Sequence, residues 1–136
     1  MRIPEKNMAI REISKSEQFQ YENQTWERLL TFFKQENNVL KTRLSEVLDR
    51  AMGKDFLALA EQFQNRFILK DEFIRELNHD VNDQKRVLGE NMANNTQSVN
   101  EKLIKRQDKL RNEVEYLEKD FALLKNEFNK YLSTAL

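Results

Sequence analysis

The sequence predicts an all-α protein, an elongated antiparallel three-helix bundle with coiled-coil-like packing. Three observations predict this fold class. Apolar residues recur at steps of three and four along three long stretches, which is the period of an α-helix. The 136 residues include only two glycines and one proline, at position 4, too few for a turn-rich β architecture. Two clusters of residues that favour turns and caps separate the three stretches.

The first helix is expected at about residues 15–52. Ser14 and Glu17 have the spacing of a capping box, in which each side chain satisfies an amide at the start of a helix. Residues 1–14 are expected to form a flexible N-terminal arm, which leaves 15–136 as a single helical bundle domain. The apolar series of this helix is Phe19, Trp26, Leu30, Phe33, Leu40, Leu44, Val47 and Ala51.

The second helix is expected at about residues 55–90. Gly53 can adopt the left-handed conformation just past a helix end, and Asp55 can cap the next helix. Glycine inside a helix costs only about 1 kcal/mol, so an alternative keeps Gly53 within one continuous helix. That alternative is a long helical hairpin or rod that completes its core by oligomerising. The apolar series is Phe56, Leu59, Ala60, Phe63, Phe67, Ile74, Leu77, Val81 and Leu88.

The third helix is expected at about residues 96–132. The segment 89–100 is rich in poor helix formers, and within it Ser98 and Glu101 have capping-box spacing. Leucines and a tyrosine then stand seven residues apart, as in the seam of a left-handed coiled coil. The full series is Val99, Leu103, Leu110, Val114, Leu117, Phe121, Leu124, Phe128 and Tyr131.

Short connections make neighbouring helices antiparallel, so the chain is expected to fold back near residues 54 and 94. This pairing places Phe33 near Ile74 and Val114, in a dry and aromatic-rich core. It also brings Asn23, Lys85 and Arg106 to neighbouring levels beside Trp26.

That polar end has two interpretations. Long cations can reach solvent past Trp26, which leaves this end of the core partly wet. Alternatively, Arg106 or Lys85 lies over the Trp26 ring or holds an anion there.

Several apolar residues fall outside the three main series and form second faces on the helices. They recur at spacings of four or seven, which places them on common faces. A lone bundle needs about one apolar face per helix, and a further apolar patch is typical of a binding surface. We therefore expect a protein-interaction surface, used for self-association, that contains Phe32, Val39, Leu69, Phe73, Tyr116 and Leu123.

Composition argues against most chemistry. The chain has no cysteine, hence no thiolate metal site or cysteine nucleophile, and no glycine-rich phosphate-binding loop. Glu76 and His79 match one Glu-x-x-His step of di-iron bundles, but such sites use the motif twice, and this chain has a single histidine. His79 is also expected about 160° away from Leu77 on the helix. No enzyme activity, cofactor or metal is expected.

The chain carries 23 basic and 23 acidic residues, so no net charge attracts nucleic acid or an anionic membrane. Charges stand where a signal peptide has its apolar core, and no apolar run is long enough to span a bilayer. The sequence thus predicts a soluble, cytoplasmic helical scaffold, adaptor or chaperone-like interaction module. Its partner is another protein or a second copy of itself. The alternative is a small-ligand- or metal-binding bundle that uses Trp26, Lys85 and Arg106.

Overall fold

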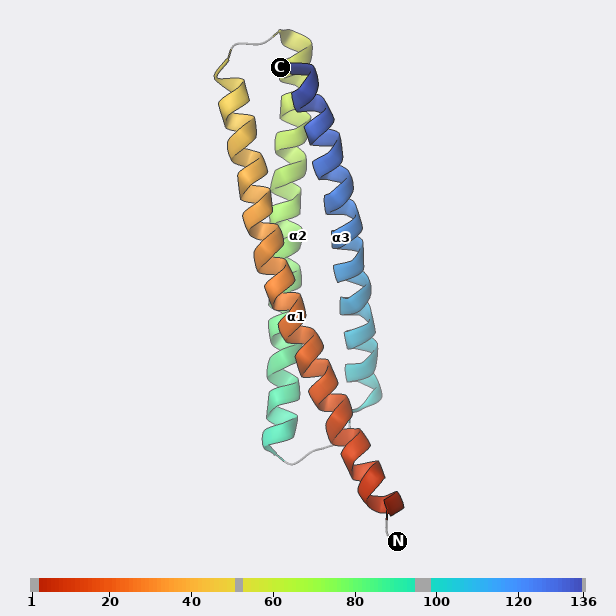
Figure 1. Ribbon diagram of the computed structural model, residues 1–136. Helices are drawn as coiled ribbons and strands as arrows, with labels where there is room; N and C mark the ends of the chain where they lie inside the picture. Colours follow the sequence, from red (N-terminus) through yellow and green to blue (C-terminus); the bar gives the residue numbers. More distant parts are fainter. Residues whose placement is uncertain (1–2, 51–52, 95–98, 136) are drawn as a thin grey trace. The chain divides into compact units, whose positions relative to one another are not determined.

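The computed structural model describes residues 3–50, 53–94 and 99–135, without the side chains of residues 3–14 and 135. Three helices make up almost all of this part, and no strand occurs in it (Figure 1). They are α1 (Ile3–Leu48), α2 (Lys54–Ala93) and α3 (Glu101–Ala135). The prediction of an all-α chain with three helices is confirmed.

Helix α1 begins earlier than the sequence pattern indicated. It starts at Ile3 rather than near residue 15, so Ser14 and Glu17 lie inside the helix and do not mark its beginning. The apolar series starts only at Phe19, and a helix can continue beyond its packed stretch without an apolar pattern to reveal it. The flexibility expected of residues 1–14 stays a prediction, because a static helix at residues 3–14 does not measure motion.

The break between α1 and α2 lies at Gly53. Helix α1 ends at Leu48 and α2 begins at Lys54, so the alternative of one continuous helix through Gly53 is wrong. The Gly53 carbonyl accepts a hydrogen bond from the Leu57 amide at 3.1 Å, which makes Gly53 the N-cap residue of α2. Asp55 lies in the first turn instead, where a carboxylate interacts favourably with the helix dipole.

Helix α3 is capped by a residue that the sequence pattern did not single out. The Leu103 amide donates a hydrogen bond to Asn100 Oδ1 at 2.9 Å, and the helix begins at Glu101. Asparagine is among the most favourable N-cap residues. The capping role expected of Ser98 lies outside the described residues.

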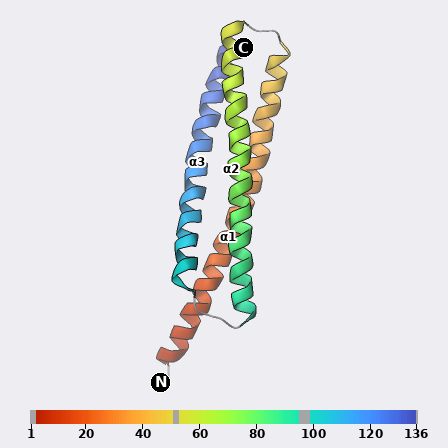
Figure 2. The same ribbon diagram turned by 180° about the vertical axis from the view of Figure 1, so that it is seen from behind.

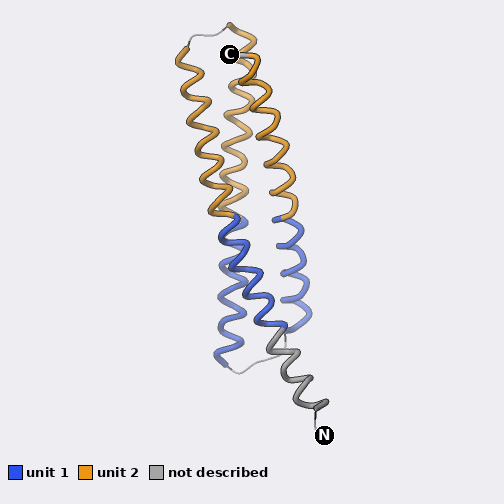
Figure 3. Tube along the Cα trace, viewed as in Figure 1, with its two compact units in different colours: residues 1–29, 77–114 blue, residues 30–76, 115–136 orange. Residues whose placement is uncertain are grey.

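The chain divides into two compact units, each built from a segment of all three helices (Figure 3). Unit 1 comprises residues 1–29 and 77–114, and unit 2 comprises residues 30–76 and 115–136.

Unit 2 has an aromatic core. The Phe128 ring lies 5.3 Å from the Phe63 ring and 5.0 Å from the Phe67 ring, and Phe33 lies 5.3 Å from Phe121. Aromatic pairs at such centroid distances stabilise a core beyond the area that they bury. The nearby Tyr131 hydroxyl donates to a backbone carbonyl of α2 at 2.9 Å, and burial raises the pKa of this phenol.

Contacts within unit 2 also establish the helix directions. Along α2 and α3, contacts pair Phe73 with Tyr116 and Phe63 with Tyr131, so these segments are antiparallel. The expected level of Phe33 was wrong: this residue meets Phe121, two helical turns beyond the predicted Val114. The predicted level combined two successive fold-backs, so it depended on the register of both.

Unit 1 has a smaller apolar cluster and a layer of buried amides. Figure 2 shows the same three helices from behind. Phe19, Leu88 and Leu103 form the apolar cluster. Gln107 Nε2 donates to Asn23 Oδ1 at 2.9 Å, and Gln84 Nε2 donates to Gln107 Oε1 at 3.2 Å. All three amides are fully buried, so unit 1 combines apolar packing with a hydrogen-bonded polar layer.

The three predicted apolar series describe the core closely. Nearly all their members within the described residues are buried. Phe56 and Val99 are only half-buried, and Ala51 lies outside the described residues. Leu59 was assigned wrongly, because it is 45% exposed while its neighbour Ala60 is buried. The core-facing positions of α2 run from Phe56 to Ala60 in one step of four residues. Leu59 lies beside this row of positions and faces solvent.

Candidate protein-interaction surface

The six apolar residues expected on the second faces all belong to unit 2. Five of them are half-exposed or more: Phe32, Val39, Leu69, Tyr116 and Leu123. Phe73 is half-buried. Apolar side chains that a folded chain leaves in water on one unit are a candidate contact surface.

Three of these residues line one groove, which we call the α2/α3 groove. Leu69 and Phe73 enter it from α2 and Tyr116 from α3, and its volume is about 280 Å³. The Phe73 and Tyr116 rings meet edge to face at 5.8 Å. Leu69 is 62% exposed and Tyr116 is 58% exposed, so the groove presents apolar surface to solvent.

The other three residues lie apart from this groove. The Phe32 ring packs edge to face on Phe33, at 5.5 Å. Val39 lines a separate shallow depression on α1, together with Asn38, Thr42, Arg43 and Glu46. Leu123 is exposed on α3 and does not line the groove.

A buried lysine lies within the α2/α3 groove. Lys70 is only 8% exposed, and its ammonium group forms an ion pair with the Asp120 carboxylate. Its Nζ atom lies 5.9 Å from the Phe73 ring centroid and 6.0 Å from that of Tyr116, within the range of cation–π attraction. The ion pair and the two rings together offset the cost of removing the ammonium group from water.

The two sides of the groove carry opposite charges. The cations Arg66 and Lys70 line it from α2, and the anion Asp120 lines it from α3. Asp120 pairs with Lys70, and Glu127 of α3, which is outside the lining, pairs with Arg66. Three of these four side chains keep 31–43% of their surface exposed, Lys70 being the exception. The groove therefore combines exposed apolar residues with cations from α2 and anions from α3.

Lys70 was not predicted from the sequence, although a signal was present. Phe63, Lys70, Leu77 and Gln84 stand seven residues apart, so the lysine occupies a core-facing position of α2. The same reasoning that singled out Asn23 could have found it. Its partner Asp120 could not be found that way, because pairing two helices requires their register.

The polar end expected around Trp26 lies in unit 1. On α2 and on α3, the buried polar residue is one position away from the predicted one. Asn23 and Trp26 are buried as expected, but the buried positions of α2 and α3 are held by Gln84 and Gln107. Lys85 and Arg106, one residue away, lie at the flanks. An amide can be buried with its hydrogen bonds made, whereas an ammonium or guanidinium group costs much more to bury.

The two flanking cations already hold carboxylates of the same chain. Lys85 Nζ lies 3.2 Å from a Glu27 carboxylate oxygen, and Arg106 Nη2 donates to Asp83 at 2.7 Å. Asp83 also accepts a hydrogen bond from Arg86. Hydrogen bonds from Arg86 and then Arg106 lower the pKa of Asp83 to about 2.

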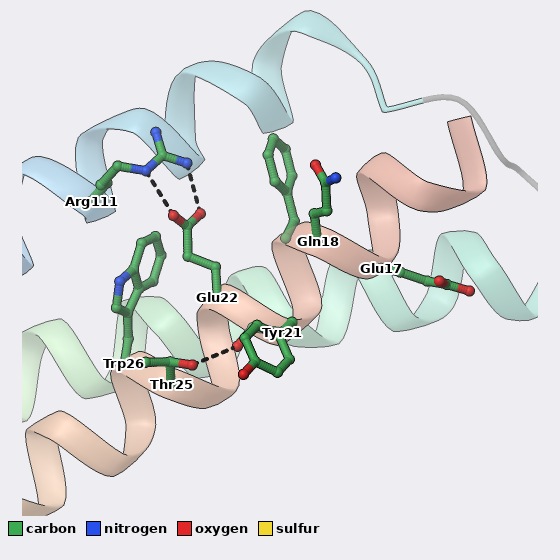
Figure 4. A pocket seen from close by; sticks show the side chains of 8 residues that line it. Glu17, Gln18, Tyr21, Glu22, Thr25, Trp26 and Arg111 are labelled. Atoms are coloured by element: carbon green, nitrogen blue, oxygen red, sulfur yellow. Dashed lines mark hydrogen bonds and ion pairs between the residues drawn. The ribbon is translucent and has the colours of Figure 1, made fainter. Parts of the chain in front are cut away.

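A cavity of about 730 Å³ lies beside Trp26 in unit 1 (Figure 4). The guanidinium group nearest to it belongs to Arg111, not Arg106. Arg111 reaches from α3 to Glu22 on α1 and donates two hydrogen bonds to that carboxylate, at 2.8 and 2.7 Å. These bonds raise the pKa of Arg111. The lining residues are Glu17, Gln18, Phe19, Tyr21, Glu22, Thr25, Trp26 and Arg111.

Within the described residues, no cluster of three or more histidine or carboxylate side chains is arranged to hold a metal ion. His79 is exposed on α2. None of the described helices has a stretch that is both long and apolar enough to cross a membrane. No family model, no curated protein and no solved structure matches this chain.

Proposed function

We propose that this protein is a non-enzymatic helical scaffold, adaptor or chaperone-like interaction module that associates with itself through unit 2. The observation that carries the proposal is the concentration of exposed apolar residues on this unit, whose own core is already filled by aromatic side chains. Apolar surface that remains in water after a core is complete can be buried against another chain. Burying apolar surface favours association by about 25 cal/mol per Å² before the entropic cost of association is subtracted.

Electrostatics support a protein partner, including a second copy. The chain has no net charge at pH 7, so two copies meet without overall repulsion. The α2/α3 groove combines exposed apolar residues with charges of both signs. An apolar centre with a polar rim is the usual anatomy of a protein–protein interface.

The proposal is tested by the mass of the protein in solution across a concentration series. We expect the weight-average mass to rise with concentration in sedimentation or light-scattering measurements. A Leu69→Glu/Tyr116→Glu variant should stay closer to monomer mass, because it places charges on the apolar surface. A matched control is Tyr21→Glu, which changes an aromatic residue that is 69% exposed in unit 1.

A monomer mass at every concentration would contradict self-association. An equal loss of association in the control and in the groove variant would show that association does not depend specifically on the surface of unit 2. Circular dichroism at each concentration verifies that both variants keep the wild-type helical content.

The Trp26 cavity supports a second candidate function, the binding of a small ligand by unit 1. Its volume falls within the range of about 300–1,000 Å³ that small-molecule pockets occupy. Because the lining cation Arg111 already pairs with Glu22, the cavity suits an aromatic or cationic ligand better than an anion. Trp26 is the one tryptophan, so its fluorescence can be titrated with tyramine and, separately, with phosphate. A signal unchanged by both probes would remove this candidate.

A further inference from the structure

We propose that a second copy of this chain occupies the α2/α3 groove of unit 2, with α2 of each copy lying against α3 of the other. This inference rests on the proposed self-association and names the surface and the arrangement that it uses. The starting observation is the polarity across the groove, which is cationic on the α2 side and anionic on the α3 side.

A two-fold axis can place this groove on itself in two ways. If the axis runs across the groove, the α2 side of one copy meets the α2 side of the other, and like charges face each other. If the axis runs along the groove, the α2 side meets the partner's α3 side. The exposed Arg66 then faces Glu127 of the second copy. Like charges that face each other cost several kcal/mol, so charge selects the axis along the groove.

The ion pairs within each copy leave room for these new contacts. The side chains of Arg66 and Glu127 are 39% and 43% exposed, and that of Asp120 is 31% exposed. Each group can therefore keep its partner within the chain and contact an opposite charge on the second copy. The resulting cluster alternates in sign, and such a network contributes more than an isolated surface pair.

The same arrangement buries the exposed apolar residues of the groove. An axis along the groove keeps each residue at its own level, so Leu69 of one copy faces α3 of the other near Tyr116. Leu69 and Tyr116 are the two most exposed groove residues, at 62% and 58%, and the half-buried Phe73 packs edge to face on Tyr116. Leucine and tyrosine anchors surrounded by charged groups resemble the centre and rim of a stable interface.

Other occupants fit the groove less well. A volume of about 280 Å³ is below the usual range for small-ligand pockets. Nucleic acid and anionic lipid both require an excess of cations, whereas here each cation stands opposite an anion. A second copy supplies the complementary pattern by symmetry, because each groove presents one cationic side and one anionic side.

A charge-reversal pair tests this arrangement directly. Arg66→Glu gives position 66 the same negative charge as Glu127. Glu127→Arg gives position 127 the same positive charge as Arg66. Each variant alone should associate at least about tenfold more weakly than the wild type, because like charges then meet across the interface. An equimolar mixture of the two variants should recover association as a mixed dimer, since opposite charges again face each other. The double variant Arg66→Glu/Glu127→Arg should also associate by itself.

The matched control reverses an Arg–Glu pair on unit 1. Arg86 and Glu90 form an exposed pair on α2, so Arg86→Glu and Glu90→Arg make the same chemical change away from the groove. We expect these control variants to associate as the wild type does. Differently sized tags distinguish mixed dimers from homodimers by mass, and circular dichroism verifies folding.

Two failures are distinguishable. If the wild type self-associates but the groove variants associate equally well, the groove assignment is wrong and the proposed function stands. If each groove variant is weakened but their mixture shows no recovery, α2 does not face α3 of the second copy. If the wild type is a monomer at every concentration, the proposed function and this inference fail together.

Discussion

Asp83 in unit 1 shows how individual side chains couple the fold to pH. Its carboxylate accepts hydrogen bonds from Arg86 and Arg106 at 2.8 and 2.7 Å, from its own helix and from α3. These bonds favour the charged form and lower the pKa from its ordinary 3.8 to about 2. A depressed carboxyl pKa contributes stability that is complete above the unfolded-state pKa and is lost as the pH falls through the folded-state value.

Replacing Asp83 with Asn should therefore lower stability most at neutral pH. We expect the difference in unfolding free energy between wild type and Asp83→Asn to be constant from pH 7 to about 4. It should then shrink as the pH falls towards 2, because the wild-type carboxyl group becomes neutral as well. Urea unfolding followed by circular dichroism measures this difference at each pH. A difference that keeps its full size down to pH 2 would contradict the assignment.

At the scale of single elements, the start of α3 offers a direct comparison of two capping residues. Asn100 Oδ1 accepts the hydrogen bond from the Leu103 amide in the structure, whereas the sequence pattern favoured Ser98. Loss of an N-cap side chain costs about 1 kcal/mol. Asn100→Ala should lower the unfolding free energy by about that amount in thermal or urea unfolding, and Asn100→Ser should largely retain it.

Ser98→Ala serves as the matched comparison for this prediction. If Asn100 is the cap, this change should leave the unfolding free energy nearly unchanged. The reverse result, a large effect of Ser98→Ala and none of Asn100→Ala, would restore the capping box predicted from sequence.

The sequence predicted the existence of the helices better than their ends. A series of apolar residues extends over many helical turns, so one wrongly assigned position hardly changes the predicted helix. The core-facing residues of all three helices follow from these series. A cap depends on one local hydrogen bond for which several polar residues compete, as Ser98 and Asn100 do. The early start of α1 at Ile3 could not be predicted, because the apolar series of this helix begins only at Phe19.

At the scale of the whole molecule, the sequence predicted which residues share a face of one helix, but it did not predict which residues of two helices meet. Spacing along α2 places Leu69 and Phe73 outside the core-facing positions, and spacing along α3 does the same for Tyr116. The helical repeat fixes the direction in which each side chain leaves its own helix. The meeting of Lys70 with Asp120 depends on the register of α2 against α3. Register follows from the turns and from the fit of the whole core, which short sequence patterns do not encode. The candidate groove was therefore predictable as exposed residues and not as a polarised site.

The two units also differ in the character of their cores, which predicts unequal resistance to local opening. Unit 2 is packed with aromatic rings, whereas unit 1 contains a layer of buried amides. Among the described residues, three buried side-chain atoms in unit 1 lack a hydrogen-bond partner, against one in unit 2; they belong to Gln20, Asn23 and Gln84, and to Asn37. Each such atom costs about 1–3 kcal/mol.

Helix α2 passes through both units, so it provides an internal comparison by hydrogen exchange. After correction for intrinsic rates, backbone amides of residues 60–74 should exchange more slowly than those of residues 81–88, because opening unit 2 exposes the larger aromatic core. The measurement is made on the Leu69→Glu/Tyr116→Glu variant at low concentration, so that contacts between copies do not protect unit 2. Equal exchange in the two segments, or slower exchange in residues 81–88, would show that the amide layer holds unit 1 as firmly as the aromatic core holds unit 2.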